Sequence, residues 1–229
     1  MIHALAGSIR DRCCRVFREG PTFMIPRIDM PGSPTGWTAR ERTTVAAAIG
    51  KAFRNGGFFQ VSNHGVSANL ISETFAEMMG FYRLSQLEKA RYAVREGAQF
   101  LGYRGLGGEK SRTHSGTEAC EQYRIGNTTD ELPLTESIKF YHERFSTAMT
   151  LFGYLTDLGD TILSACALDL GLPEHFFDQF LTKPMHRLGL NYYGVTHRDE
   201  AHHEVDYLMS PHTDQSLITI LTQDELASR

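Results

Sequence analysis

Cysteine is scarce in this chain, which contains only four in 229 residues. They are Cys13, Cys14, Cys120 and Cys166, and neither their number nor their spacing fits the disulfide framework of a small secreted domain. Paired cysteines and histidines at the short, fixed spacings of zinc sites are also absent. We therefore expect reduced thiols and a cytoplasmic location.

Neither a dominant charge nor a long apolar run is present. The formal net charge is −4, and acidic and basic residues are interspersed. This pattern argues against binding to nucleic acid or to an anionic membrane, and no apolar run reaches the length of a transmembrane helix. There are no internal repeats or low-complexity tracts. With 41% hydrophobic residues, the chain can bury the core of a single domain.

A His-x-Asp motif, His212-Thr213-Asp214, is the most informative feature that the sequence does contain. Residues 217–222 are rich in β-branched side chains and are typical of a strand. Because alternate side chains of an extended chain share a face, His212 and Asp214 can point into one cavity. An imidazole and a carboxylate are two of the three ligands that hold non-haem Fe(II). The alternative interpretation is a turn with an N-capping residue.

Four further segments precede this motif, and their order along the chain is informative. They are Gly-Gly-Phe-Phe-Gln-Val-Ser-Asn-His-Gly-Val at 56–66, Phe-Leu-Gly-Tyr-Arg-Gly-Leu-Gly at 100–107, Glu-Gln-Tyr-Arg-Ile-Gly at 121–126 and Arg-Leu-Gly-Leu-Asn-Tyr-Tyr at 187–193. With the His-x-Asp motif, they resemble the isopenicillin N synthase-like branch of the Fe(II)- and 2-oxoglutarate-dependent oxygenases. The resemblance runs from about Met24 to Asp224. It implies an α+β fold, with an N-terminal helical region and an incomplete double-stranded β-helix, the jelly-roll core of cupin-like proteins.

The resemblance also implies roles for five residues. His212 and Asp214 correspond to the first two iron ligands. Asn191 and Tyr193 correspond to the Asn-x-Tyr that lines the 2-oxoglutarate site, and Arg104 is a candidate for binding the substrate. The implied reaction oxidises a small organic substrate with O2, Fe(II) being the cofactor and 2-oxoglutarate the co-substrate. In the alternative interpretation Tyr193 is a core aromatic residue and Arg104 a solvated loop residue.

The family's distal histidine and its Arg-x-Ser would fall beyond Arg229, so we expect a C-terminally truncated member whose activity is impaired. The nearby His202 and His203 lie in a polar segment that is typical of an exposed loop. The other hypothesis is a non-catalytic remnant or interaction module, which could self-associate through open sheet edges.

Periodicity and capping residues predict the remaining elements. A helix should begin after Thr38, with Glu41 completing a capping box, and end near Asn55. Further helices are expected over 68–82, 86–94, 136–170 and 172–181, with a glycine-rich, flap-like loop over 97–116. The predicted organisation is a disordered or misassigned extension (1–23), an N-terminal oxygenase region (24–130), and a scaffold helix with the first part of the jelly roll (131–229).

Overall fold

The chain is described by a computed structural model that covers residues 2–6, 24–32, 36–95, 100–106, 120–128, 136–194, 214 and 216–223. It divides into two compact units, each built from separate stretches of sequence. The first unit comprises residues 1–68, 153–182 and 213–229, and the second comprises 69–152 and 183–212. The units therefore interleave along the chain. Among the described residues, no helix is both long and apolar enough to cross a membrane.

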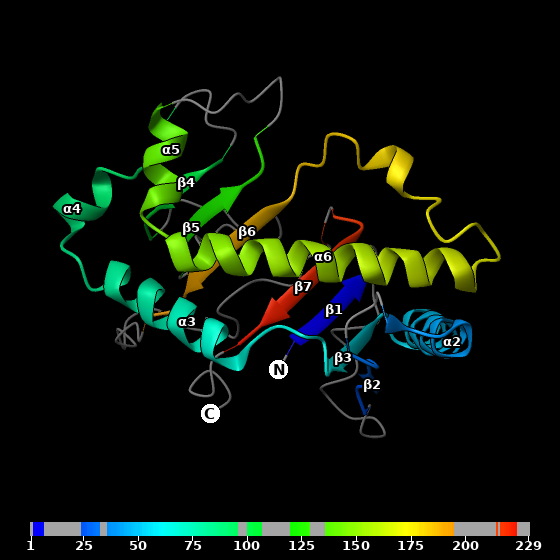
Figure 1. Cartoon of the computed structure of the whole chain (residues 1–229). Helices are drawn as coiled ribbons and strands as arrows, with labels where there is room; N and C mark the ends of the chain where they lie inside the picture. The colour runs from blue at the N-terminus through cyan, green and yellow to red at the C-terminus, as the bar shows by residue number, and fades with distance from the viewer. Residues whose placement is uncertain are drawn as a thin grey trace, which may run out of the picture. The chain divides into compact units, whose positions relative to one another are not determined.

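The first unit contains a four-stranded sheet in the order β2-β3-β1-β7 (Figure 1). Strand β2 (Arg27–Asp29) is parallel to β3 (Phe58–Ser62), which pairs in antiparallel fashion with β1 (Ile2–Ala6). On its other edge β1 pairs with β7 (Ile218–Thr222), also antiparallel. The strand expected within residues 217–222 is thus present. Residues 2–6, which fall within the predicted extension of residues 1–23, form strand β1 between β3 and β7.

Helix α2 (Ala39–Asn55) begins at the predicted capping box. The Glu41 carboxylate accepts the backbone N–H of Thr38, and the Thr38 hydroxyl accepts the backbone N–H of Glu41. Its buried residues lie on one face, and α2 packs against β2 and β3. Gly57, with a φ of 76°, makes the turn into β3 in a conformation that favours glycine.

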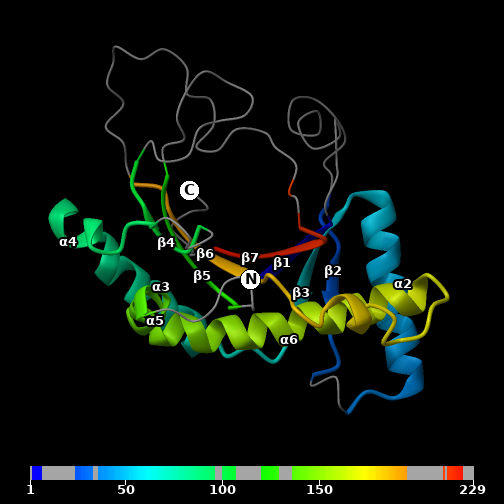
Figure 2. The same ribbon diagram turned by 90° about the horizontal axis from the view of Figure 1, so that it is seen from above.

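The second unit is built on a three-stranded antiparallel sheet in the order β4-β5-β6. Its strands are β4 (Gly102–Arg104), β5 (Glu121–Gly126) and β6 (Arg187–Tyr192). Its helices include α3 (Ala68–Tyr82), α4 (Gln86–Ala90) and α5 (Glu136–Glu143). Figure 2 shows α3 and α5 on the same side of this sheet. Strand β4 lies inside the segment predicted to be a flap-like loop.

The core of the second unit is aromatic. Phe81 has no exposed surface, and its ring contacts those of Tyr82, Tyr92, Tyr103, Tyr123 and Phe145 at centroid distances of 5.0–5.5 Å. Most of these contacts are edge-on, the geometry that aromatic pairs prefer. The cluster covers one face of the β4-β5-β6 sheet. Side chains that alternate with the core residues along these strands therefore lie on the opposite face.

A buried ion pair joins α4 to the beginning of β5. The Lys89 side chain is 3% exposed, and its Nζ donates to Glu121 Oε2 at 2.6 Å. The Tyr103 hydroxyl donates to the same carboxylate oxygen. Burial, followed by this hydrogen bond, raises the pKa of Tyr103, which therefore remains a neutral donor. The carboxylate of Glu121 is thereby held on the core side of the sheet.

Residues 136–170 form two helices where one was predicted. Helix α5 ends at Glu143, and α6 (Ser146–Asp169) begins three residues later. The break places the ring of Phe145 in the aromatic core. The Glu77 carboxylate of α3 accepts the backbone N–H groups of Thr147 and Ala148 at 3.3 and 3.0 Å, which satisfies donors at the new helix start. The short helix predicted over 172–181 is only a 3₁₀ turn at Asp178–Phe180.

We predict that Glu77→Ala lowers the free energy of unfolding by about 1 kcal/mol, because it removes the acceptor for two N–H groups at the start of α6. Urea denaturation followed by circular dichroism measures this change. Glu73→Ala is the matched control, since Glu73 is exposed on the same helix. Equal effects of the two substitutions would contradict the capping role of Glu77.

The buried ion pair gives a second prediction. Glu121→Gln should lower the free energy of unfolding by roughly 3–5 kcal/mol, because it leaves a buried ammonium without its counter-charge. The double variant Lys89→Met/Glu121→Gln should recover much of that loss, whereas Glu143→Gln at an exposed position of α5 should change little. A double variant no more stable than Glu121→Gln alone would show that the pair is not the cause.

Candidate active site

Of the His-x-Asp motif, the structure describes Asp214; His212 lies outside the described residues. Asp214 is half-buried just before β7, and its Oδ2 accepts a hydrogen bond from Thr219 Oγ1 at 2.6 Å. A hydrogen bond of this kind orients a carboxylate that binds a metal. Since a carboxylate has about four acceptor positions, the bond to Thr219 is compatible with coordination. The donor chemistry at Asp214 therefore fits Fe(II).

No third ligand can be identified in the described part of the chain. Among those residues, no group of three histidine, cysteine, aspartate or glutamate side chains could hold a metal ion. His202 and His203, in the polar segment before the motif, lie outside the described residues. The predicted metal pair therefore remains a prediction, supported on the Asp214 side by the bond from Thr219.

Asn191, the first residue of the predicted co-substrate pair, lies on β6 directly opposite Gln122 of β5. Gln122 Nε2 donates to Asn191 Oδ1 at 2.6 Å. Because its oxygen is used in this way, the Asn191 amide is oriented with its NH2 donors turned away from Gln122. Those donors suit a carboxylate oxygen of 2-oxoglutarate.

Arg104 lies in the same cross-strand row. It is the last residue of β4 and pairs with Gln122, so that Arg104, Gln122 and Asn191 occupy successive strands in one row. Directly opposed residues share a face of the sheet. The Arg104 guanidinium lies 4.8 Å from the centroid of the Phe100 ring. The structure thus brings together two residues that the sequence had proposed for different ligands.

The two tyrosines that follow Asn191 differ in environment. Tyr192 packs against the aromatic core, and its ring stacks on Tyr82 at 4.9 Å. The Tyr82 hydroxyl donates to the Leu190 carbonyl, and burial raises the pKa of this phenol. Tyr192 therefore has a structural role. Tyr193 is half-buried immediately after β6, where strand alternation favours the face that carries Asn191.

Sequence reasoning did not single out Gln122, although it lies in a segment quoted for the resemblance. The pattern that could have found it is the alternation of Gln122 and Arg124 with the aromatic or aliphatic Tyr123 and Ile125. Tyr123 and Ile125 have no exposed surface and belong to the core. Gln122 and Arg124 consequently lie on the opposite face.

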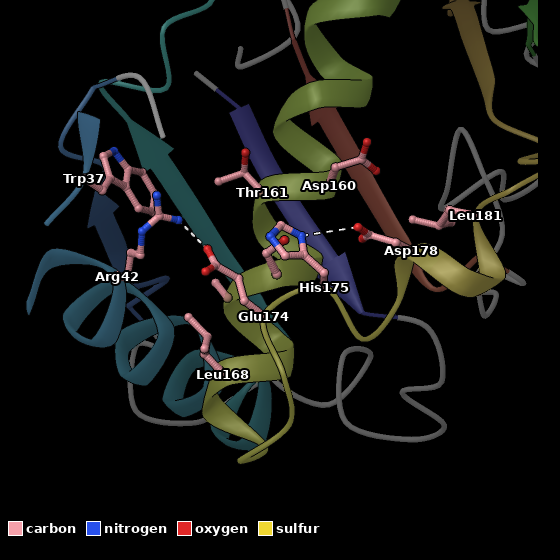
Figure 3. Close-up of a pocket in the computed structure, with 11 residues that line it drawn as sticks. Trp37, Arg42, Asp160, Thr161, Leu168, Glu174, His175, Asp178 and Leu181 are labelled. Atoms are coloured by element: carbon pink, nitrogen blue, oxygen red, sulfur yellow. Dashed lines mark hydrogen bonds and ion pairs between the residues drawn. The ribbon is translucent and has the colours of Figure 1, made fainter. Parts of the chain in front are cut away.

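A separate cavity of about 470 Å³ lies in the first unit. Figure 3 shows its lining, which includes Trp37 and two ion pairs: Arg42 with Glu174, and His175 Nδ1 with Asp178 Oδ2 at 3.2 Å. None of the residues predicted for catalysis or binding lines it. Because these four polar side chains pair with one another, this cavity is a weaker candidate than the β4-β5-β6 sheet.

Comparison with known proteins gives a family match over about half of the chain. Residues 25–144 match the model of a family described as "non-haem dioxygenase in morphine synthesis N-terminal". The 2-oxoglutarate-Fe(II) type oxidoreductase ppzC of Metarhizium rileyi is 30% identical over 234 residues, covering 90% of this chain and 62% of the relative. Flavanone 3-dioxygenase 2 of Oryza sativa is 28% identical, covering 90% of this chain and 60% of the relative. The chain thus spans about three fifths of the length of these curated relatives.

Solved structures support the same assignment at the level of the fold. A full-length Neurospora crassa protein in complex with alpha-KG superimposes with a TM-score of 0.58 at 20% identity, covering 74% of this chain and 54% of that protein. JOX2 in complex with 2OG, Fe and JA gives a TM-score of 0.54 at 23% identity, covering 76% of this chain and 51% of JOX2. These matches confirm the α+β fold with part of a jelly-roll core. The name of the Metarhizium rileyi relative, a 2-oxoglutarate-Fe(II) type oxidoreductase, supports Fe(II) and 2-oxoglutarate as the cofactor and co-substrate of this group. The chain belongs to the non-haem Fe(II)- and 2-oxoglutarate-dependent dioxygenases.

Proposed function

We propose that this chain takes part in the oxidation of a small organic substrate by O2, coupled to the oxidative decarboxylation of 2-oxoglutarate to succinate. The observation that carries the proposal is the row on the β4-β5-β6 sheet in which Gln122 orients Asn191. Relatives support a small-molecule substrate through their names, such as flavanone 3-dioxygenase, and through a Neurospora crassa structure in complex with alpha-KG and thymine. A cytoplasmic location is part of the proposal, supported by the fact that Cys120 and Cys166 form no disulfide.

In this proposal His212 and Asp214 bind Fe(II), with Thr219 orienting the Asp214 carboxylate. Fe(II), when bound, supplies the electron transfer to O2 that the oxidation requires. Asn191 and Tyr193 position 2-oxoglutarate by donating hydrogen bonds to a carboxylate oxygen. The protein's contribution is to orient the reactants and to keep the donor groups at fixed positions.

A second candidate function is association with another copy of the chain through β7. Strand β7 is the last in its sheet, paired only with β1 among the described strands. Leu217 is 62% exposed and Leu221 38% exposed beside this edge. An apolar strand edge of this kind can pair with another chain. This candidate corresponds to the non-catalytic remnant or interaction module considered from the sequence.

Metal and co-substrate binding separate the two candidates. We expect Fe(II) to bind stoichiometrically under anaerobic conditions, with at least tenfold loss of affinity in His212→Ala and in Asp214→Ala. Asp157→Ala, at an exposed position of α6, is the control and should leave the affinity unchanged. Isothermal titration measures both affinities, and the appearance of succinate measures 2-oxoglutarate turnover. Asn191→Ala should weaken 2-oxoglutarate binding without changing Fe(II) binding.

If Fe(II) binds His212→Ala as tightly as it binds the unaltered chain, the enzymatic proposal is wrong. If light scattering then showed a dimer that Leu221→Lys dissociates, the interaction module would be the better account.

A further inference from the structure

A buried amide oxygen without a hydrogen-bond donor lies on the central strand of the β4-β5-β6 sheet. Gln122 is 7% exposed, and its Nε2 donates to Asn191 Oδ1 at 2.6 Å. Gln122 Oε1, by contrast, has no hydrogen-bond partner in the described structure. A buried acceptor without a donor costs free energy, and native proteins satisfy nearly all such groups. The Gln122 oxygen is therefore suited to a donor that comes from a ligand.

The orientation of the Gln122 amide follows from that of Asn191. The two residues lie directly opposite each other on β5 and β6, and the bond between them uses the Asn191 oxygen. In the proposed function the Asn191 NH2 group donates to 2-oxoglutarate, so its oxygen is the atom that faces Gln122. Turning the Gln122 amide over would bring two acceptor oxygens to the 2.6 Å separation of this bond. Nε2 must therefore face Asn191, and Oε1 must face away from it.

The co-substrate cannot supply the missing donor. At neutral pH 2-oxoglutarate is a dianion whose carboxylate and keto oxygens only accept hydrogen bonds. Asn191 and Tyr193 can donate to it, but it has no hydrogen to donate to Gln122 Oε1. The donor must therefore come from the primary substrate or from an ordered water.

Gly189 gives a ligand access to this pair of amides. It is exposed, and it lies two residues before Asn191 on β6, so both residues belong to the same face of the sheet. A Cβ at Gly189 would lie 3.4 Å from Asn191 Oδ1 and 3.6 Å from Gln122 Nε2. Because Oε1 belongs to the same planar amide as Nε2, it lies within about 6 Å of that position. A ligand that enters where the side chain is missing can thus reach Gln122 Oε1.

The charge beside Gly189 favours a neutral donor. Arg124 is directly opposite Gly189 in the strand register. Its positive charge acts on this part of the sheet, because burial and then Arg124 lower the pKa of Arg187. An ammonium group that entered at Gly189 would meet the same repulsion. A hydroxyl or an uncharged N–H group supplies the hydrogen without this penalty.

We infer that Gln122 recognises the primary substrate, and that this substrate carries an uncharged O–H or N–H group. The substrate enters beside Gly189 and donates to Gln122 Oε1. The inference rests on the proposed function, because the orientation of Gln122 depends on Asn191 binding 2-oxoglutarate. The two polar atoms of one amide then have separate tasks: Nε2 positions Asn191 for the co-substrate, and Oε1 selects the substrate.

Matched pairs of small ligands test this hydrogen bond on the full chain, with 2-oxoglutarate present and Zn(II) in place of Fe(II). Phenol is compared with anisole, and 2-pyridone with N-methyl-2-pyridone, by ligand-observed NMR titration to millimolar concentrations. In at least one pair the member with the donor should bind at least fivefold more tightly. Gln122→Met, which keeps the size of the side chain but removes the acceptor, should reduce that preference below twofold. Gln179→Met, at an exposed position outside this sheet, should leave it unchanged.

Substitutions at Gly189 test the route of entry independently of Gln122. Gly189→Ala and Gly189→Val should weaken binding of the donor-bearing ligand progressively, by at least fivefold in Gly189→Val. The Cβ in Gly189→Ala meets the Asn191 oxygen and not its NH2 group. Affinity for 2-oxoglutarate should therefore change less than twofold in this variant. Gly80→Ala, at an exposed position of α3, is the matched control and should leave both affinities unchanged.

Three results would overturn the inference: equal binding within both pairs, no binding of either donor-bearing ligand, or a preference that survives in Gln122→Met. The first two would leave an ordered water as the donor to Oε1, and the third would place recognition of the donor elsewhere. Fe(II) and 2-oxoglutarate titrations are run separately. A chain that binds both without any preference would refute the inference alone. A chain that shows the preference but binds neither would refute the proposed function and keep Gln122 as a ligand-binding residue.

Discussion

The alternation of side chains along β5 and β6 is the constraint on which the candidate site depends. Tyr123, Ile125 and Leu190 point into the aromatic core around Phe81, which is inaccessible to solvent. A one-residue shift in register would place these side chains on the other face and lose that burial. Core packing therefore fixes where Gln122 and Asn191 lie. Packing of the hydrophobic core thus determines the geometry of the site, and neither strand requires a strained backbone.

Polar groups on the core side reinforce the same register. The Lys89–Glu121 pair holds the first residue of β5, and the Tyr82 hydroxyl holds the Leu190 carbonyl in β6. Both anchors lie next to a site residue, since Glu121 precedes Gln122 and Leu190 precedes Asn191. A buried ion pair contributes little net stability but penalises alternatives that separate its charges. Here it favours the one register that brings the Gln122 and Asn191 amides into hydrogen-bonding distance.

Local patterns predicted much of the fold, and tertiary contacts account for the differences. The capping residues Thr38 and Glu41 predict α2, and apolar periodicity predicts α3. Both signals depend only on residues that are close in sequence. The break before α6 depends on Glu77, about seventy residues away in sequence, and no proline or glycine marks it. Strand β1 depends on pairing with β3 and β7. At the site, the family motif gave Asn191 and Asp214, whereas Gln122 emerged only from the strand register.

We propose that the Gln122–Asn191 face of the β4-β5-β6 sheet binds 2-oxoglutarate. The most direct measurement is a two-dimensional 15N–1H NMR titration of the side-chain amides with 2-oxoglutarate, with diamagnetic Zn(II) in place of Fe(II). The side-chain NH2 signals of Asn191 and Gln122 should shift together and saturate. Asn127, whose side chain bonds the Pro184 carbonyl, should not move and serves as the internal reference. Shifts elsewhere, with the Asn191 and Gln122 signals unchanged, would show that 2-oxoglutarate does not bind at this face.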